Sequence, residues 1–257
     1  MKVTFLGSGT SQGVPVIACD CKVCTSMDSR DKRLRSSIML SHKGKNYVID
    51  CGPDFRQQML VNKVNSLSAI LLTHEHKDHV AGLDDVRAYN FREKKDMEVF
   101  CSYRVEEAIK REYHYIFAEN KYPGSPSINI NRINSVSPFN IDPEVKVMPI
   151  EVMHHKLPVL GFRFGDFSYI TDAKTVSAKE RNKIRGSKIL VVNALRQSEH
   201  ISHFNLEEAL NFIKDISPEK AYLTHISHLF GTHEEIQALL PVNVDVAHDG
   251  LTLQINI

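Results

Sequence analysis

The 257-residue sequence lacks an apolar run long enough to cross a membrane and lacks any block of like charges. A membrane span needs about 20 predominantly apolar residues, so we expect no membrane contact. No positively charged N-terminal segment followed by an apolar stretch is present, and we therefore place the chain in the cytoplasm. A net charge of +1 disfavours a nonspecific nucleic-acid clamp, so nucleic acid is not the expected partner.

Cysteine is scarce as well, with five residues in all, an odd number. Three of them, Cys19, Cys21 and Cys24, crowd into six positions, which argues against a disulfide framework in a cytoplasmic chain. Three such thiols could hold a structural zinc but lack a fourth ligand. The alternatives are free thiols or an iron-sulfur cluster completed by Cys51 or Cys101.

Patterns of strands and helices recur along both halves of the chain. Alternating or continuous apolar runs predict strands, and 3.6-residue periodicity predicts helices, near 55–61, 80–92 and 104–119. Ser177, Asn205 and Thr232 each precede an acidic residue by three positions, which is typical of a helix start. The chain breaks at 122–126, so we expect two strand-rich halves of about 1–124 and 125–257, forming two packed sheets with helices outside.

The densest chemical pattern is Thr73-His74-Glu75-His76-Lys77-Asp78-His79, directly after the apolar run 69–72. If the backbone stays extended past Thr73, His74, His76 and Asp78 point to one side, because side chains alternate along a strand. Imidazole and carboxylate are ligands that zinc, manganese and iron accept. This heptad therefore predicts half of a metal site.

Further metal-type side chains follow the expected strands of the C-terminal half. His154 and His155, then Asp172, then His225 and His228, each come after an apolar run. Strand ends share one rim of a sheet, so these distant positions can converge on the heptad. Taken singly, each has an ordinary explanation as a capping or hydrogen-bonded residue.

With these residues in view, the chain resembles the metallo-β-lactamase superfamily, whose hallmark His-x-His-x-Asp-His is present at 74–79. The resemblance covers essentially all of 1–257 and implies one domain, an α/β four-layer αβ/βα sandwich of two mixed sheets. It implies two divalent metal ions, zinc or manganese. The first would be held by His74, His76 and His154, and the second by Asp78, His79 and His225, with Asp172 bridging.

Within the superfamily, the chain is similar to the phosphoribosyl cyclic phosphodiesterases of the carbon-phosphorus lyase pathway. The similarity rests on the segments 7–15, 19–24 and 223–228. It implies a closed structural zinc held by Cys19, Cys21, Cys24 and His228. It also places a catalytic histidine at His203, while the roles of His155, His200, His233 and His248 stay open.

The implied enzyme is a dinuclear metal-dependent hydrolase of a small phosphodiester, such as a phosphoribosyl cyclic phosphate. We expect a metal-bridged hydroxide to attack phosphorus, Asp78 to orient it, and His203 to protonate the departing oxygen. The resemblance leaves a homodimer open. The aromatic segment 113–131 would either line the substrate pocket or pack in the core, and packing is the more usual outcome.

Rival functions fit less well. Ribonuclease Z carries a long arm between the third metal histidine and the bridging aspartate, and only seventeen residues separate His154 from Asp172 here. A β-lactamase would be expected to carry an export signal. A thioesterase leaves the three clustered cysteines without a role. A metal-binding module without chemistry ranks lowest, because all seven ligand positions and His203 are present.

Overall fold

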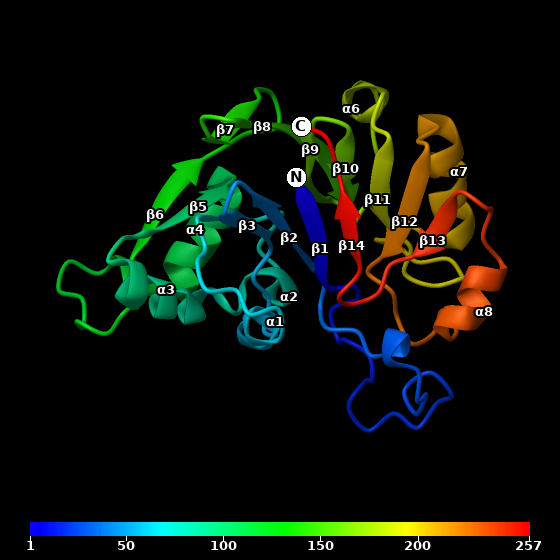
Figure 1. Ribbon diagram of the computed structural model, residues 1–257, viewed down its shortest axis with the longest axis horizontal. Coiled ribbons are helices and arrows are strands. Elements are labelled where there is room, and N and C mark those ends of the chain that lie inside the picture. The colour runs from blue at the N-terminus through cyan, green and yellow to red at the C-terminus, as the bar shows by residue number, and fades with distance from the viewer.

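The computed structural model describes residues 1–257 and consists of two seven-stranded sheets packed face to face (Figure 1). The first sheet has the strand order β14-β1-β2-β3-β4-β5-β6. Its strands are β1 (Lys2–Gly7), β2 (Ser37–His42), β3 (Lys45–Ile49), β4 (Ala69–Leu71), β5 (Met97–Cys101), β6 (Ile128–Arg132) and β14 (Thr252–Gln254). Antiparallel pairs around β1 and β2 and parallel pairs from β3 to β6 make this sheet mixed.

The second sheet is also mixed and has the order β13-β12-β11-β10-β9-β8-β7. Its strands are β7 (Phe139–Asp142), β8 (Val145–His154), β9 (Leu157–Phe164), β10 (Phe167–Tyr169), β11 (Ile189–Asn193), β12 (Lys220–Thr224) and β13 (Val244–Val246). The chain crosses from one sheet to the other between β6 and β7, and β14 returns to pair with β1. The predicted break at 122–126 lies in the loop before β6.

Helices cover the outer face of each sheet, so the four-layer sandwich predicted from the sequence is confirmed (Figure 1). Those of the N-terminal layer are α1 (Phe55–Val61), α2 (Lys77–Val80), α3 (Arg87–Glu93), α4 (Tyr103–Glu112) and α5 (His114–Phe117). Those of the C-terminal layer are α6 (Ala178–Ile184), α7 (Leu206–Ile216) and α8 (His233–Ala238). Two short 3-10 helices, η1 (Ser29–Asp31) and η2 (Leu83–Val86), complete the set.

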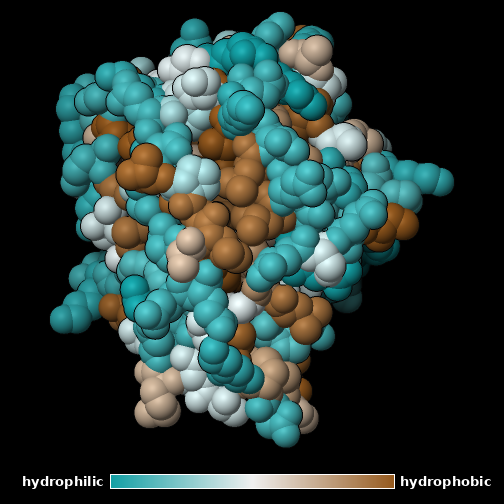
Figure 2. Space-filling view, turned by 90° about the vertical axis from the view of Figure 1, so that its right-hand side faces the viewer, coloured by the Kyte–Doolittle hydropathy of each residue, from teal (hydrophilic) through white to brown (hydrophobic).

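Three apolar clusters fill the three spaces between the four layers. One cluster of 21 buried residues lies between the sheets and joins Phe5 of β1 to Phe162 of β9. A second, of 20 residues, lies under the N-terminal helices, and a third, of 22 residues, lies under α6, α7 and α8. On the surface that carries α7 and α8, apolar side chains gather in the middle and polar side chains surround them (Figure 2).

The helix starts predicted from the sequence are confirmed by their capping contacts. Asn205 and Thr232 each form a reciprocal capping box with a glutamate three residues on, and the Ser177 side chain accepts a hydrogen bond from the Glu180 amide. The helical pattern predicted near 80–92 corresponds to the end of α2, then η2 and α3, with a break between α2 and η2. The chain turns at Gly82, where an added Cβ would lie 2.3 Å from the Gly52 carbonyl oxygen, and only then does α3 begin.

The helical pattern predicted near 104–119 corresponds to α4 and α5, which Tyr113 separates. The Tyr113 hydroxyl donates a hydrogen bond to the Val80 carbonyl, and its ring is buried in the N-terminal core. Phe117 packs against the same core, whereas Tyr122 is exposed. Tyr115 is exposed as well, so the aromatic segment packs only through Tyr113 and Phe117. None of the helices combines the length and apolar character that crossing a membrane requires.

Candidate metal centre

The candidate ligands collect at one edge of the two sheets, where strands end. His74 and His76 follow β4, His154 ends β8, Asp172 follows β10 and His225 follows β12. The extended backbone expected past Thr73 reaches only His76, because Lys77 begins α2. Asp78 and His79 therefore sit on the first turn of that short helix.

The backbone is left-handed at three strand ends around the site, those of β3, β10 and β12. The φ angles are 64° at Asp50, 57° at Asp172 and 59° at His225. Non-glycine residues rarely adopt such angles, and they persist only where the surrounding structure holds them. All three side chains are essentially inaccessible to solvent.

Asp172 lies at the centre of the candidate site. Its Oδ2 is 3.3 Å from His79 Nε2, and its Oδ1 is 3.4 Å from His225 Nε2. His79 Nε2 is also 3.1 Å from an oxygen of Asp78. Asp78, His79, Asp172 and His225 thus form a group whose ligand atoms all lie within 4.8 Å of one another. This is the set expected around the second metal.

The three histidines expected around the first metal lie beside that group. Ring centroids are 4.5 Å apart for His74 and His76, 5.2 Å for His76 and His154, and 5.9 Å for His74 and His154. His154, rather than His155, faces this cluster, while His155 is exposed at the turn between β8 and β9. The structure therefore brings together all seven side chains singled out in the sequence.

Two buried imidazole nitrogens support metal binding at this place. The Nε2 atoms of His74 and His79 are buried and neither makes a well-formed hydrogen bond in the protein, although that of His79 faces the Asp78 and Asp172 carboxylates. Orphaned polar atoms of this kind are costly in a protein interior unless something else binds them. The donor set of imidazoles and carboxylates suits a divalent ion, so the residues fit such a group.

The pKa values follow from burial and from the facing charges. Burial holds the pKa of His74 well below its usual range and lowers the pKa of His225 to about 4. Burial opposes the charged form of His79 too, but the carboxylates of Asp78 and Asp172 raise its pKa well above the usual range. A divalent ion bound there would take the place of the His79 proton.

Hydrogen bonds on the far side of the rings fix which nitrogen faces the site. The Nδ1–H of His79 donates to Asp50 Oδ2 at 2.7 Å, and that of His154 donates to the Ser202 carbonyl at 2.9 Å. The Ser36 hydroxyl donates to the Gly9 carbonyl, so at 3.1 Å it accepts the Nδ1–H of His225. Each ring thus turns Nε2 toward the site, where the Thr10 hydroxyl lies 3.2 Å from His225 Nε2.

The sequence reasoning missed these supporting residues. Thr73 also belongs to them, because its hydroxyl donates to Asp50 and lies 3.0 Å from His74 Nδ1. Asp50 could have been found, since it is a carboxylate directly after a strand that neighbours β4. No local pattern marks Ser36, a serine among others at the start of β2.

His203 joins the same centre from the loop before α7. Its Nε2 is 3.0 Å from Asp172 Oδ1, and its Nδ1 is 3.1 Å from Ser202 Oγ. His200 adds a ring 5.0 Å away, with its Nδ1 3.1 Å from the His203 Nδ1. His203 is therefore placed to exchange a proton with a group bound at Asp172.

The three clustered cysteines meet His228, as the sequence resemblance implies. Cys19 Sγ and Cys21 Sγ lie 3.3 Å and 3.4 Å from His228 Nδ1, and Cys24 completes the group within 4.8 Å. Cys51 and Cys101 are buried in the N-terminal core and cannot supply a fourth ligand. A donor set of three thiols and one imidazole fits a closed tetrahedral zinc.

The remaining histidines lie outside both clusters. His233 is buried beside Arg33, whose guanidinium nitrogen lies 3.3 Å from His233 Nδ1, and His248 stacks edge-on to it with ring centroids 5.8 Å apart. Neither belongs to a group with metal-ligand spacing. They form part of the packing beneath the cysteine loop.

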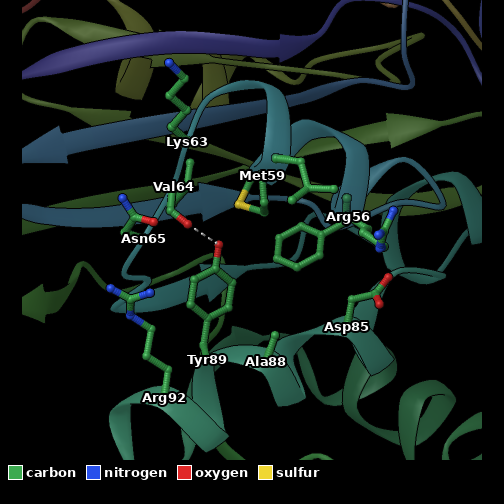
Figure 3. Close-up of a pocket in the computed structure, with 11 residues that line it drawn as sticks. Arg56, Met59, Lys63, Val64, Asn65, Asp85, Ala88, Tyr89 and Arg92 are labelled. Atoms are coloured by element: carbon green, nitrogen blue, oxygen red, sulfur yellow. Dashed lines mark hydrogen bonds between the residues drawn. The ribbon is translucent and has the colours of Figure 1, made fainter.

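A hollow of about 600 Å³ lies between α1 and α3, away from the candidate metal centre (Figure 3). Phe55, Met59 and Tyr89 form its apolar floor, and Arg56, Lys63 and Arg92 stand at its rim. No residue of the histidine and aspartate cluster lines it. The Tyr89 hydroxyl, which points across it, already donates to the Val64 carbonyl. This hollow is therefore separate from the candidate centre.

Comparison with known proteins agrees with this geometry. Residues 45–226 match the family described as the β-lactamase superfamily domain. The chain belongs to the metallo-β-lactamase superfamily. A crystal structure described as a new diphosphatase from the PhnP family is 36% identical, with a TM-score of 0.92, and the match covers 100% of this chain and 98% of that one. The chain thus has the metallo-β-lactamase fold and is similar to this diphosphatase over its whole length.

More distant structures share the fold. Zinc-bound PqqB from Methylobacterium extorquens has a TM-score of 0.80 at 22% identity, covering 99% of this chain and 100% of that one. The short form of human tRNase Z has a TM-score of 0.70 at 19% identity, with both chains fully covered.

Among curated sequences, an octanoyltransferase from Porphyromonas gingivalis is 40% identical over 253 residues. The match covers 98% of this chain and 51% of that protein, so the chain spans about half the length of this relative. Coenzyme PQQ synthesis protein B from Methylobacterium radiotolerans is 37% identical over 101 residues, which are 34% of each protein.

Proposed function

We propose that this chain is a dinuclear metal-dependent phosphodiesterase acting on a small phosphodiester or a related phosphate linkage. His74, His76 and His154 would hold one ion, Asp78, His79 and His225 the other, and Asp172 both. The observation that carries this proposal is the convergence of these seven side chains, where the buried His74 Nε2 has no hydrogen-bond partner in the protein. Similarity to the PhnP-family diphosphatase supports a phosphate substrate.

Two divalent ions, when bound, would supply a water of lowered pKa and neutralise charge on the phosphate oxygens. The chain's own residues do the rest. Asp78 lies beside His79 and would orient the attacking water through its carboxylate. His203, held at Nδ1 by its neighbours, would donate the Nε2 proton to the departing oxygen.

A structural zinc at Cys19, Cys21, Cys24 and His228 forms the second part of the proposal. Zinc bound by four protein ligands has no open position, so it would stabilise the loop rather than take part in the reaction. Manganese is disfavoured here, because thiolate ligands select softer metals.

A nuclease of the ribonuclease Z type remains the weaker candidate. Between His154 and Asp172 the chain forms only the short turn after β8, strand β9 and strand β10, with no arm to grip a transfer RNA. Octanoyl transfer is likewise not extended to this chain, which matches only about half of the relative so named. A cluster of histidines and aspartates around orphaned nitrogens suits hydrolysis.

The test combines metal analysis with a substrate panel. Purified protein is loaded with zinc or manganese and assayed on a bis-aryl phosphodiester, a five-membered cyclic ribose phosphate, a diphosphate, a β-lactam and an octanoyl thioester. We expect turnover of the phosphate compounds only, with about two exchangeable ions and one tightly held zinc. Activity confined to the β-lactam or the thioester would refute the proposed function.

A further inference from the structure

The hollow between α1 and α3 is large enough to hold a small molecule (Figure 3). Its volume of about 600 Å³ lies within the roughly 300–1,000 Å³ of typical ligand pockets. Each of the two helices has seven residues and is therefore about 10 Å long, which limits the length of a ligand that lies along them. Six of the eleven lining residues are apolar, so most of the wall suits a carbon chain.

The floor of the hollow is apolar and offers no side-chain donor. Phe55 and Met59 of α1 and Tyr89 of α3 are each at most 8% exposed. The Tyr89 hydroxyl donates its proton to the Val64 carbonyl at 3.0 Å, so it cannot donate to a ligand. A charged group placed on this floor would lose its bonds to water without replacement. The floor therefore selects the apolar part of a ligand.

Polar side chains divide between two ends of the hollow. Figure 3 shows Lys63, Asn65 and Arg92 toward one end, and Arg56 with Asp85 toward the other. At the second end, the Asp85 carboxylate offsets the charge of Arg56. At the first end no acidic residue lines the hollow, so two positive charges and an amide remain. We therefore expect an anionic group to bind at the end formed by Lys63 and Arg92.

The charges of Lys63 and Arg92 are not used within the protein. Both side chains are exposed, and neither makes an ion pair or a side-chain hydrogen bond. Lys95, just after α3, differs, because its Nζ lies 2.7 Å from Glu93 Oε2. An anion could pair with Lys63 and Arg92 without breaking a contact, and a guanidinium can bind a carboxylate through two N–H groups.

One kind of ligand meets the requirements of both the floor and the charged end. A carboxylate at the end of an acyl chain would place the chain on the floor and the carboxylate beside Lys63 and Arg92. An inorganic anion would leave the apolar floor uncovered, and an uncharged hydrocarbon would leave both cations unpaired. Because the helices are only about 10 Å long, a chain of medium length is the best match.

We propose that the hollow between α1 and α3 is a binding site for a free medium-chain carboxylate. Its acyl chain would cover Phe55, Met59 and Tyr89, and its carboxylate would pair with Lys63 and Arg92. None of the residues of the candidate metal centre lines this hollow, so the inference stands apart from the proposed function. A carboxylate bound here would leave the metal centre free for substrate.

Calorimetric titration of the metal-loaded protein tests the site with hexanoate, octanoate, decanoate and uncharged 1-octanol. Two added methylene groups should tighten binding about tenfold, because each is buried against the floor. Octanoate should bind about tenfold more tightly than 1-octanol, since two exposed ion pairs each contribute modestly. Dependence on both the chain and the charge is the signature of the proposed site.

Substitutions separate the two ends of the hollow. Lys63→Ala and Arg92→Ala should each weaken octanoate binding about threefold and leave 1-octanol binding unchanged. Arg56→Ala is the matched control, because it removes a cation of the same hollow at the end that holds Asp85, and its octanoate affinity should be that of the unsubstituted protein. Ala88→Trp fills the hollow from an exposed position of α3 and should abolish binding of the whole series.

Absence of binding, or equal affinities for octanoate and 1-octanol, would overturn the proposal. Equal losses in Arg56→Ala and Arg92→Ala would do so too, because they would show a general effect of charge. Octanoate binding that persists in folded Ala88→Trp would place the carboxylate elsewhere, such as on the metal ions. Thermal unfolding checks that each variant is folded, and the exposed Lys63 and Arg92 decide the question if Ala88→Trp is not.

Discussion

The histidine and aspartate cluster and the cysteine cluster are built by opposite means. The first draws its members from the ends of strands in both sheets, and partners such as Asp50, Ser36 and the Ser202 carbonyl fix the ring nitrogens. The second takes three of its four members from a single loop that projects between β1 and β2 (Figure 1). Its apolar packing is limited to the buried Val14 and Val23 and the partly buried Val16.

The two clusters therefore differ in what holds their side chains in place. The sheets hold the first cluster before any ion arrives, so a metal there would mainly supply chemistry. The loop has little apolar packing of its own, so a metal there would mainly supply structure. Substitutions can separate the two roles, because a change in the first cluster should lower activity without loosening the loop. A change in the second cluster should loosen the loop without acting directly on the reaction.

Removal of Asp172 should have the largest effect. Asp172→Asn takes away a charge that faces His79, His203 and His225. Activity on a phosphodiester should fall by more than the ~100-fold that losing a hydrogen-bond partner of a ligand costs. Metal analysis should still find the zinc of the cysteine cluster. Loss of all metal would show that the two clusters are not independent.

His203 comes next and should separate metal binding from turnover. His203→Ala should keep the full metal content but lower kcat about 100-fold or more, most of all on substrates with poor leaving groups. A set of aryl phosphodiesters with graded leaving groups measures this trend. A uniform loss across the set would argue that His203 orients the substrate and does not deliver a proton.

A smaller and more selective effect is expected at Ser36. Ser36→Ala removes the acceptor of the His225 Nδ1–H and should weaken one of the two exchangeable ions about 10-fold to 100-fold. Competition with a chelator measures the affinity. Ser41→Ala, at the solvent-facing end of β2, removes a hydroxyl bonded only to Asn46 and is the control. Equal affinities in the two variants would exclude a positioning role.

The smallest effect concerns thiol labelling of the cysteine loop. In metal-free protein, hydrogen bonds from the Cys24 backbone and His228 lower the pKa of Cys21 to about 6, while burial raises the pKa of Cys24 to about 11. At pH 7.5 Cys21 should therefore be alkylated well before Cys24, and its labelling should slow as the pH falls through 6. Mass spectrometry of digested protein follows both sites. Zinc should protect both, and labelling unaffected by zinc would contradict the proposed site.

Much of this arrangement could be predicted because it depends on local patterns. A histidine or carboxylate that directly follows an apolar strand lies at the rim of its sheet, and this placed His74, His154, Asp172 and His225 near one another. The hydroxyl of Ser36 could not be predicted, because its role arises only when β2 meets a segment 189 residues further along the chain. A short stretch of sequence carries no pattern that indicates a contact so far along the chain.

The same reason explains the elements that were missed. β14 pairs with β1 across almost the whole length of the chain, and its three residues carry too little pattern to be recognised. The interruption at Gly82 depends on the close approach of the Gly52 backbone. The carbonyl of Cys51, the residue before Gly52, accepts a hydrogen bond from the Gly82 N–H. Periodicity predicts a helix well when the helix covers a sheet, but not where another backbone passes within contact distance.

One short segment belongs to both clusters. His225 faces the candidate metal centre and His228 faces the cysteines, and between them Ile226 exchanges backbone hydrogen bonds with Ser8 and Thr10. Because these backbone hydrogen bonds already hold the segment, His225 and His228 keep their places whether or not the neighbouring ion is bound. The four residues 225–228 would therefore let two ions bind close together along the chain without either one depending on the other.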